Sequence, residues 1–158
     1  PIFPTVMMVV RGAISELSKK ARQTVFVTLR ELINAKSYIC AVPVNLSFAV
    51  RVLATDNSEE TDAVLVSVYD DCRSMLIRRD IILALASHNV DYWISAQIKR
   101  FSSCTLWEKR ALIIASYILE DEGGYWRDRI KKSFSKFDRL LMDWAAEQKS
   151  VGRPILLG

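Results

Sequence analysis

The feature that most constrains the fold is a motif that occurs twice between Ser74 and Lys149. In each copy a basic pair opens an apolar helix, a turn follows, and a Tyr-Trp dipeptide begins a second helix that carries a phenylalanine. The first copy contains Arg78-Arg79, Tyr92-Trp93 and Phe101, and the second contains Lys109-Arg110, Tyr125-Trp126 and Phe134. A repeat of roughly 30 to 45 residues with two helices is typical of α-solenoids. We therefore predict an all-α fold of antiparallel helix pairs, stacked as a HEAT-like or armadillo-like α-solenoid.

The length and composition agree with a helix-rich globular chain. With 158 residues, the chain can bury about 70% of the surface that its unfolded form exposes. Hydrophobic residues make up 51% and charged residues 25%, and only five glycines and four prolines interrupt them. We predict a single helical-repeat domain over residues 1–150, with the clearest repeats at 74–149 and a tail at 151–158.

Apolar residues at spacings of three and four predict helices along the whole domain. The predicted helices cover residues 4–17, 21–35, 44–54, 58–69, 74–88, 91–101, 105–119, 126–134 and 137–149. Residues 37–42 have a strand-like composition and are interpreted as a turn, because Pro43 disfavours helix at the residue before it. Thr105 and Glu108 form a capping box, which predicts a helix start there. In the helix at 21–35 we predict an inward face with Arg30 on or near the opposite side. That inward face comprises Val25, Leu29, Leu32 and Ile33.

Few side chains fit a catalytic or metal-binding role. His88 is the only histidine and lies at a helix end, where we expect it to interact with terminal carbonyls. Cys40, Cys72 and Cys104 form an odd set without short spacings, so neither a disulfide framework nor a zinc site is indicated. The sequence contains no glycine-rich phosphate loop. We predict no cofactor, no metal and no catalysis by this chain alone.

Positive charge is concentrated in the second half of the chain. Residues 1–71 carry seven Lys and Arg against eight Asp and Glu, whereas residues 72–158 carry fifteen against ten. Six cations lie within residues 127–139, and we predict them as candidate nucleic-acid-binding residues because they can contact phosphates without reading sequence. They are Arg127, Arg129, Lys131, Lys132, Lys136 and Arg139.

The tryptophans offer a second route to nucleic acid, by stacking on bases. They are Trp93, Trp107, Trp126 and Trp144. Their helical phase with neighbouring Ile and Leu favours a role as core anchors instead.

No segment indicates a membrane or secreted protein. The apolar run at residues 6–10 is too short to span a bilayer. No basic segment with a cleavage site opens the chain, so a signal peptide is not indicated. We therefore predict a cytoplasmic protein without a membrane partner. Because a helix rich in core residues begins close to Pro1, we expect the chain to be part of a longer protein.

Several motifs resemble the helical C-terminal region of certain bacterial reverse transcriptases, over about residues 70–149. They are Arg78-Arg79-Asp80-Ile81-Ile82-Leu83, Tyr92-Trp93, Trp107-Glu108-Lys109-Arg110-Ala111, Ile114-Ala115-Ser116-Tyr117, Asp121-Glu122-Gly123, Trp126-Arg127 and Asp143-Trp144-Ala145-Ala146. In that family an RNA-directed DNA polymerase domain precedes the helical region, and several relatives act in defence against phages. The polymerase carboxylates are absent here. The tyrosine of Val68-Tyr69-Asp70-Asp71 stands one position too late for Tyr-x-Asp-Asp, so we interpret that segment as a helix end.

The resemblance implies a non-catalytic accessory domain that contacts nucleic acid, RNA or DNA, or an upstream polymerase domain. Two other interpretations stay open. One is a protein-protein interaction or oligomerisation scaffold unrelated to polymerases. The other is an independent enzyme such as a helical-repeat DNA glycosylase, which would require a carboxylate in a basic concave groove.

Overall fold

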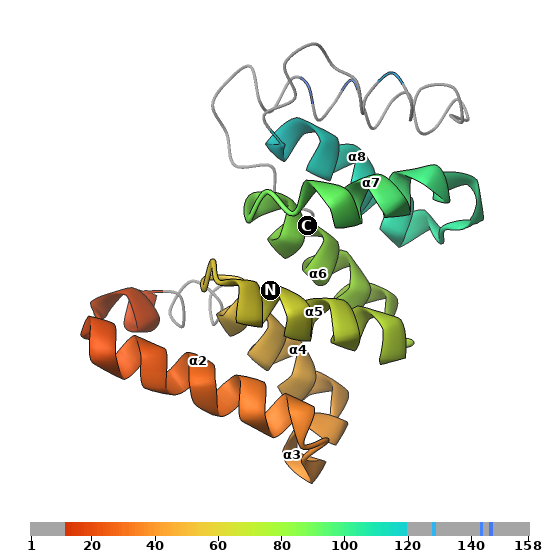
Figure 1. Cartoon of the computed structure of the whole chain (residues 1–158). Coiled ribbons are helices and arrows are strands. Elements are labelled where there is room, and N and C mark those ends of the chain that lie inside the picture. Colours follow the sequence, from red (N-terminus) through yellow and green to blue (C-terminus); the bar gives the residue numbers. More distant parts are fainter. Residues whose placement is uncertain (1–11, 120–127, 129–142, 144–145, 147–158) are drawn as a thin grey trace. The chain divides into compact units, whose positions relative to one another are not determined.

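The computed structural model describes residues 12–119 together with residues 128, 143 and 146 (Figure 1). Contacts divide the chain into two compact units, Pro1–Asp71 and Cys72–Gly158, which we call the N-terminal and the C-terminal unit. All regular structure in the described residues is helical and none of it is strand, which confirms the predicted all-α fold. The single domain over residues 1–150 and the stacking as a solenoid stay predictions.

The N-terminal unit has four labelled helices after a helical turn at residues 12–16. They are α2 (Lys19–Asn34), α3 (Tyr38–Ala41), α4 (Pro43–Leu53) and α5 (Glu59–Asp71). Helix α2 packs against the other three. It begins where the Ser18 hydroxyl accepts a hydrogen bond from the Ala21 N–H at 3.2 Å. It ends before Lys36, whose φ of 48° lies in the left-handed region that commonly terminates helices.

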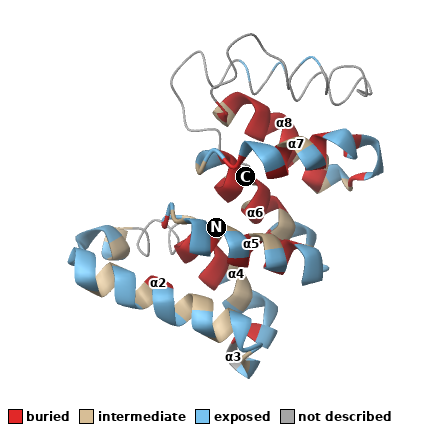
Figure 2. Ribbon diagram, in the orientation of Figure 1, coloured by how far each residue is buried: buried red, intermediate tan, exposed pale blue. Residues whose placement is uncertain are grey.

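Helix α2 buries a different face from the predicted one. Phe26 is its buried residue, whereas the four apolar residues predicted to face inward are only half-buried (Figure 2). Arg30 was predicted on or near the outer side, yet its side chain is only 16% exposed. Periodicity identifies an apolar stripe, but the neighbouring helices decide which edge of that stripe is covered. Here they cover the edge that contains Phe26 and Arg30, which are four residues apart and share a face.

The segment predicted as a turn before Pro43 forms the short helix α3, so that prediction was wrong. Pro43 occupies the first position of α4, where its missing N–H leaves no hydrogen bond unmade. Val42 is extended, with φ −78° and ψ 121°, as the residue before a proline prefers. The proline therefore separates two helices without preventing a helical turn just upstream.

The C-terminal unit is described as far as residue 119. It contains α6 (Met75–Ser87), α7 (Asp91–Lys99), a 3₁₀ turn (Phe101–Ser103) and α8 (Leu106–Ile118). Helix α6 ends before Asn89, which adopts a left-handed φ of 58°. The predicted capping box of α8 is confirmed. Thr105 Oγ1 accepts from the Glu108 N–H at 3.4 Å, and Glu108 Oε2 accepts from the Thr105 N–H at 2.8 Å.

The core of the C-terminal unit lies where α6 packs against α8. Its centre consists of fully buried branched residues, each of which contributes roughly 1.5–3 kcal/mol by leaving water. They are Ile81, Ile82 and Leu85 on α6 and Leu112, Ile113 and Ile114 on α8. Helix α7 and the 3₁₀ turn add Trp93, Ile94, Ile98 and Phe101, which are all buried. Of the helices predicted at 126–134 and 137–149, only residues 128, 143 and 146 are described, and all three are helical. The tail predicted at 151–158 lies outside the described residues.

Candidate functional site

The six candidate nucleic-acid-binding residues lie outside the described part of the chain. They are Arg127, Arg129, Lys131, Lys132, Lys136 and Arg139. Whether they share one face stays a prediction. The structure does describe the basic pairs that open the two repeats.

Four basic residues, Arg78, Arg79, Lys109 and Arg110, lie in the first two turns of α6 and α8, and we call them the repeat-start cluster. Arg78 Nε lies 3.2 Å from Glu108 Oε1, so the first turns of the two helices lie side by side. The N-terminal end of a helix carries the positive end of its dipole. Four cations at two such ends are electrostatically unfavourable unless nearby groups compensate them.

One buried carboxylate compensates Arg78 and caps α8 at the same time. The Glu108 side chain is 2% exposed, and its Oε1 pairs with Arg78. Its Oε2 accepts hydrogen bonds from the Thr105 N–H and the Thr105 hydroxyl, both at 2.8 Å. Because charged hydrogen bonds in a buried site are strong, Glu108 ties the starts of both helices together.

The other three cations are held by a carboxylate or by aromatic rings. Arg79 Nε and Nη2 donate to Asp80 Oδ1 at 3.0 and 2.9 Å. Lys109 Nζ lies 5.6 Å from the centroid of the Phe101 ring. The guanidinium carbon of Arg110 lies 5.1 Å from the Trp107 ring centroid, within the range of cation–π attraction. The repeat-start cluster therefore stabilises the helix pair and still leaves more positive than negative charge at this end.

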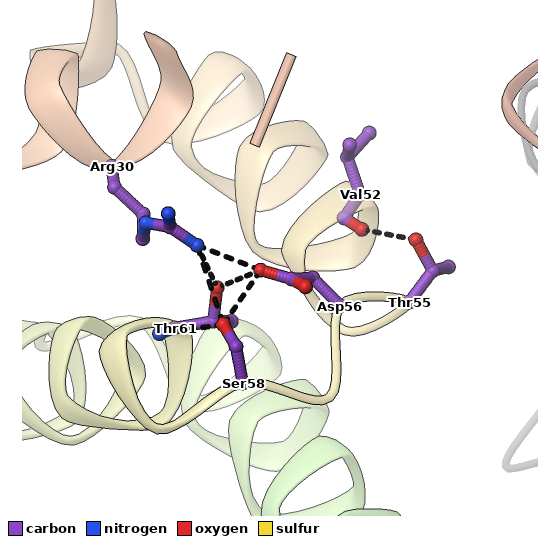
Figure 3. Close-up of polar contacts among 6 residues, drawn as sticks. All are labelled: Arg30, Val52, Thr55, Asp56, Ser58 and Thr61. Atoms are coloured by element: carbon purple, nitrogen blue, oxygen red, sulfur yellow. Dashed lines mark hydrogen bonds and ion pairs between the residues drawn. The ribbon is translucent and has the colours of Figure 1, made fainter. Parts of the chain in front are cut away.

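A second polar cluster lies in the N-terminal unit (Figure 3). Arg30 Nη1 on α2 donates to Asp56 Oδ2 at 2.7 Å, to Thr61 Oγ1 at 2.9 Å and to Ser58 Oγ at 3.3 Å. The Ser58 hydroxyl donates to the same Asp56 oxygen at 2.9 Å, and the Thr61 hydroxyl donates to it as well. We call these four residues the Arg30 network. It joins α2 to the turn between α4 and α5, and each of its polar side chains has a partner.

The sequence analysis did not identify Arg30 as a partner of Asp56 and Ser58. Ser58 also caps α5, because the Thr61 N–H donates to Ser58 Oγ at 3.3 Å. Arg30 and Asp56 are 26 positions apart, beyond the reach of any local pattern. The one available signal was the four-residue spacing of Arg30 from Phe26, which places both on one helical face.

The cysteines are free thiols and do not form a reactive centre. Burial raises the pKa of the Cys40 thiol, and it raises the pKa of the Cys104 thiol as well. A raised pKa disfavours the thiolate, which is the nucleophilic form, so these two thiols are poor nucleophiles. His88 occupies the predicted helix end, where its backbone N–H donates to the Ala84 carbonyl at 3.0 Å.

The acidic residues considered in the sequence lie where a helix ends. Asp70 and Asp71 are exposed in the last turn of α5, and Asp71 Oδ2 lies 3.7 Å from Lys36 Nζ. Tyr69 before them is buried, so the interpretation as a helix end is confirmed. Among residues 12–119, 128, 143 and 146, no three His, Cys, Asp or Glu side chains lie close enough to hold a metal ion.

Of the tryptophans in the described residues, Trp93 is buried in the core as predicted, and Trp107 is half-buried beneath Arg110. Trp126 and Trp144 lie outside that part of the chain. Within the same part, we find no helix whose length and hydropathy would let it cross a membrane.

No protein-family model, curated protein or solved structure matches this chain.

Proposed function

We propose that this chain is a non-catalytic helical accessory domain of a bacterial reverse transcriptase, which contacts nucleic acid or the body of the polymerase in the cytoplasm. The observation that carries the proposal is the difference in charge between the two units. The N-terminal unit has seven Lys and Arg against eight Asp and Glu, whereas the C-terminal unit has fifteen against ten. The positive excess therefore belongs to one compact unit, which can attract a polyanion.

The repeat-start cluster supports a division of labour within the C-terminal unit. Its cations are held by Glu108, Asp80, Phe101 and Trp107, so they stabilise the helices and add a positive field. We therefore expect the six candidate residues between Arg127 and Arg139 to make the direct phosphate contacts. Only two carboxylates lie among these six cations. The polymerase part of the proposal rests on the sequence resemblance.

Salt dependence of binding tests the proposal. Fluorescence anisotropy of the full chain with labelled single-stranded RNA, single-stranded DNA and duplexes should show binding at low salt. If all six cations meet phosphates of a single strand, the slope of log K against log salt is about −4. Replacing the six residues by Gln should remove most of this slope. The matched control is Lys19→Gln with Lys20→Gln, two exposed cations of the N-terminal unit, which should leave it unchanged. Absence of binding even at low salt would refute phosphate contact.

An interaction or oligomerisation scaffold unrelated to polymerases is the second candidate. Solvent-exposed apolar side chains on the N-terminal unit favour this second candidate, since Tyr38 is 83% exposed and Val44 is 64% exposed. Association through such side chains should be insensitive to salt between low and moderate concentrations, in contrast to phosphate binding.

A further inference from the structure

The corner formed by α3 and α4 exposes several large apolar side chains, and we call them the α3–α4 patch. They are Tyr38, Val42, Val44 and Phe48, with exposed fractions of 83, 49, 64 and 42%. Val44 and Phe48 are one helical turn apart on α4 and share a face. Helix α3 packs against α4, so the four residues belong to one local structure. Several large apolar side chains exposed on two packed helices mark an interaction site more often than a single exposed residue does.

The charges around the α3–α4 patch are as informative as its apolar groups. Residues 37–50 contain no charged side chain, although several of them face water. Charges of both signs lie just outside this stretch. Lys36 precedes it and is exposed, with its Nζ 3.7 Å from the exposed carboxylate of Asp71. An apolar centre beside a polar rim is the usual anatomy of a protein-protein contact.

We propose that the α3–α4 patch is a self-association surface that the same patch of a second copy of this chain covers. In a twofold contact each patch meets itself, so any charge near the axis would oppose its own like charge. The α3–α4 patch has no such charge. Its rim offers both a cation and a carboxylate, so opposite charges can pair between two copies. A polyanion fits poorly because the patch contains no cation. This inference does not depend on nucleic-acid binding by the C-terminal unit.

A patch of four large side chains supports a weak contact, because interfaces well below the standard size are usually transient. We therefore expect a monomer–dimer equilibrium with a dissociation constant in roughly the micromolar range or weaker. Sedimentation velocity of the full chain over a wide concentration range measures it directly. The mass should rise from 18.0 kDa toward twice that value as concentration increases. It should do so equally at low and moderate salt.

Two substitutions test whether the α3–α4 patch is responsible. Val44→Asp places like charges opposite each other in the dimer. The new carboxylate lies in the first turn of α4, where the helix dipole favours negative charge, so the monomer should not be destabilised. Tyr38→Ser removes the most exposed aromatic ring of the patch. Each should raise the dissociation constant at least about tenfold, as loss of a central contact residue does. The matched control is Tyr92→Ser, which removes a 75% exposed tyrosine near the start of α7 and should change nothing.

Circular dichroism of each variant should show unchanged helicity, which separates lost association from unfolding. A chain that stays monomeric at every concentration would overturn the proposal, including the case in which the patch binds only a different protein. A dimer that Val44→Asp and Tyr38→Ser leave intact would also overturn it. Nucleic-acid binding is measured separately by its salt dependence, so failure of one proposal is distinguishable from failure of the other.

Discussion

The two units hold their helices together by different means. In the C-terminal unit, α6 and α8 bury apolar side chains on nearly every side, and polar contacts are concentrated at the helix starts. In the N-terminal unit, α2 buries only Phe26 and is attached to the turn before α5 by the Arg30 network. The described helices of the C-terminal unit are joined mainly by apolar burial, whereas α2 of the N-terminal unit is attached by directional polar contacts. Helices α4 and α5 of the N-terminal unit also bury apolar side chains, among them Val50, Leu53 and Leu65.

This difference determines where each unit is vulnerable. Apolar burial is non-directional and is shared among many residues. Truncation of one apolar side chain therefore removes only the stabilisation that this side chain contributed. A buried ion pair fixes two elements at one point, and removal of one partner leaves the other charge uncompensated. The attachment of α2 in the N-terminal unit is therefore sensitive to a single substitution in the Arg30 network. The N-terminal unit also exposes several large apolar side chains to solvent, at the α3–α4 patch.

The largest effect should come from breaking the apolar core of the C-terminal unit. Leu112→Ala, at a fully buried position of α8, should lower the free energy of unfolding by about 3 kcal/mol because it leaves a cavity. Urea unfolding followed by circular dichroism measures this. The control is Leu106→Ala on the same helix, where the side chain is 49% exposed and the loss should stay below about 1 kcal/mol. Equal losses at both positions would contradict the assigned core.

The next largest effect should come from breaking the Arg30 network. Asp56→Ala leaves the largely buried Arg30 guanidinium without its carboxylate and should cost about 2 kcal/mol. Hydrogen exchange should rise in α2 and α5 more than in α6 and α8, because the damage lies in the N-terminal unit. Arg30→Met combined with Asp56→Ala should cost less than the sum of the two single changes. Additive costs would show that the two residues are not energetically coupled.

A smaller effect on stability should come from replacing a buried polar side chain of the C-terminal unit by an apolar one. Gln97 on α7 is 7% exposed, and its Oε1 has no hydrogen-bond partner within the described part of the chain. Gln97→Met keeps the side-chain length and removes the desolvated amide, so it should stabilise by about 1 kcal/mol. Thermal unfolding measures the gain. Gln23→Met, at an exposed site on α2, should give none, and an equal gain there would point to a general effect of methionine.

The smallest expected effect concerns the thiols. Burial raises the pKa of Cys104, so the folded chain retains a proton that the unfolded chain loses above about pH 8.5. The stabilising contribution is complete below that pH and is lost as pH rises through the folded pKa. The urea midpoint should therefore fall less between pH 7.5 and 9.5 in Cys104→Ala than in the unmodified chain. Cys72→Ser, at a half-buried site, is the control.

Alkylation rates give an independent measurement of how far burial protects each cysteine thiol. At pH 8, mass spectrometry should show iodoacetamide modifying Cys72 before Cys40 and Cys104, because both of the latter are buried. Faster modification of Cys104 than of Cys72 would contradict its burial.

Local patterns were sufficient for several elements. The capping box at Thr105, the helix end at Asp70-Asp71 and the buried Trp93 were predicted from local patterns and are found as expected. These signals act over one helical turn, where the chain's own geometry decides which groups meet. The candidate nucleic-acid-binding residues were also chosen from a local pattern, and they stay a prediction.

Other features required the tertiary structure. Arg30 meets Asp56 only because α2 packs against the region before α5, and this contact spans 26 positions. The same packing decided that Phe26 is buried while Val25 and Leu29 are not, and it left Tyr38 and Val44 in water.

The sequence by itself determined that the described chain is helical, because the period of apolar residues and the helix caps are short-range properties. Only the tertiary structure decided which side of α2 is covered. That choice depends on neighbours distant in sequence, whose combined burial outweighs the preference of any single residue.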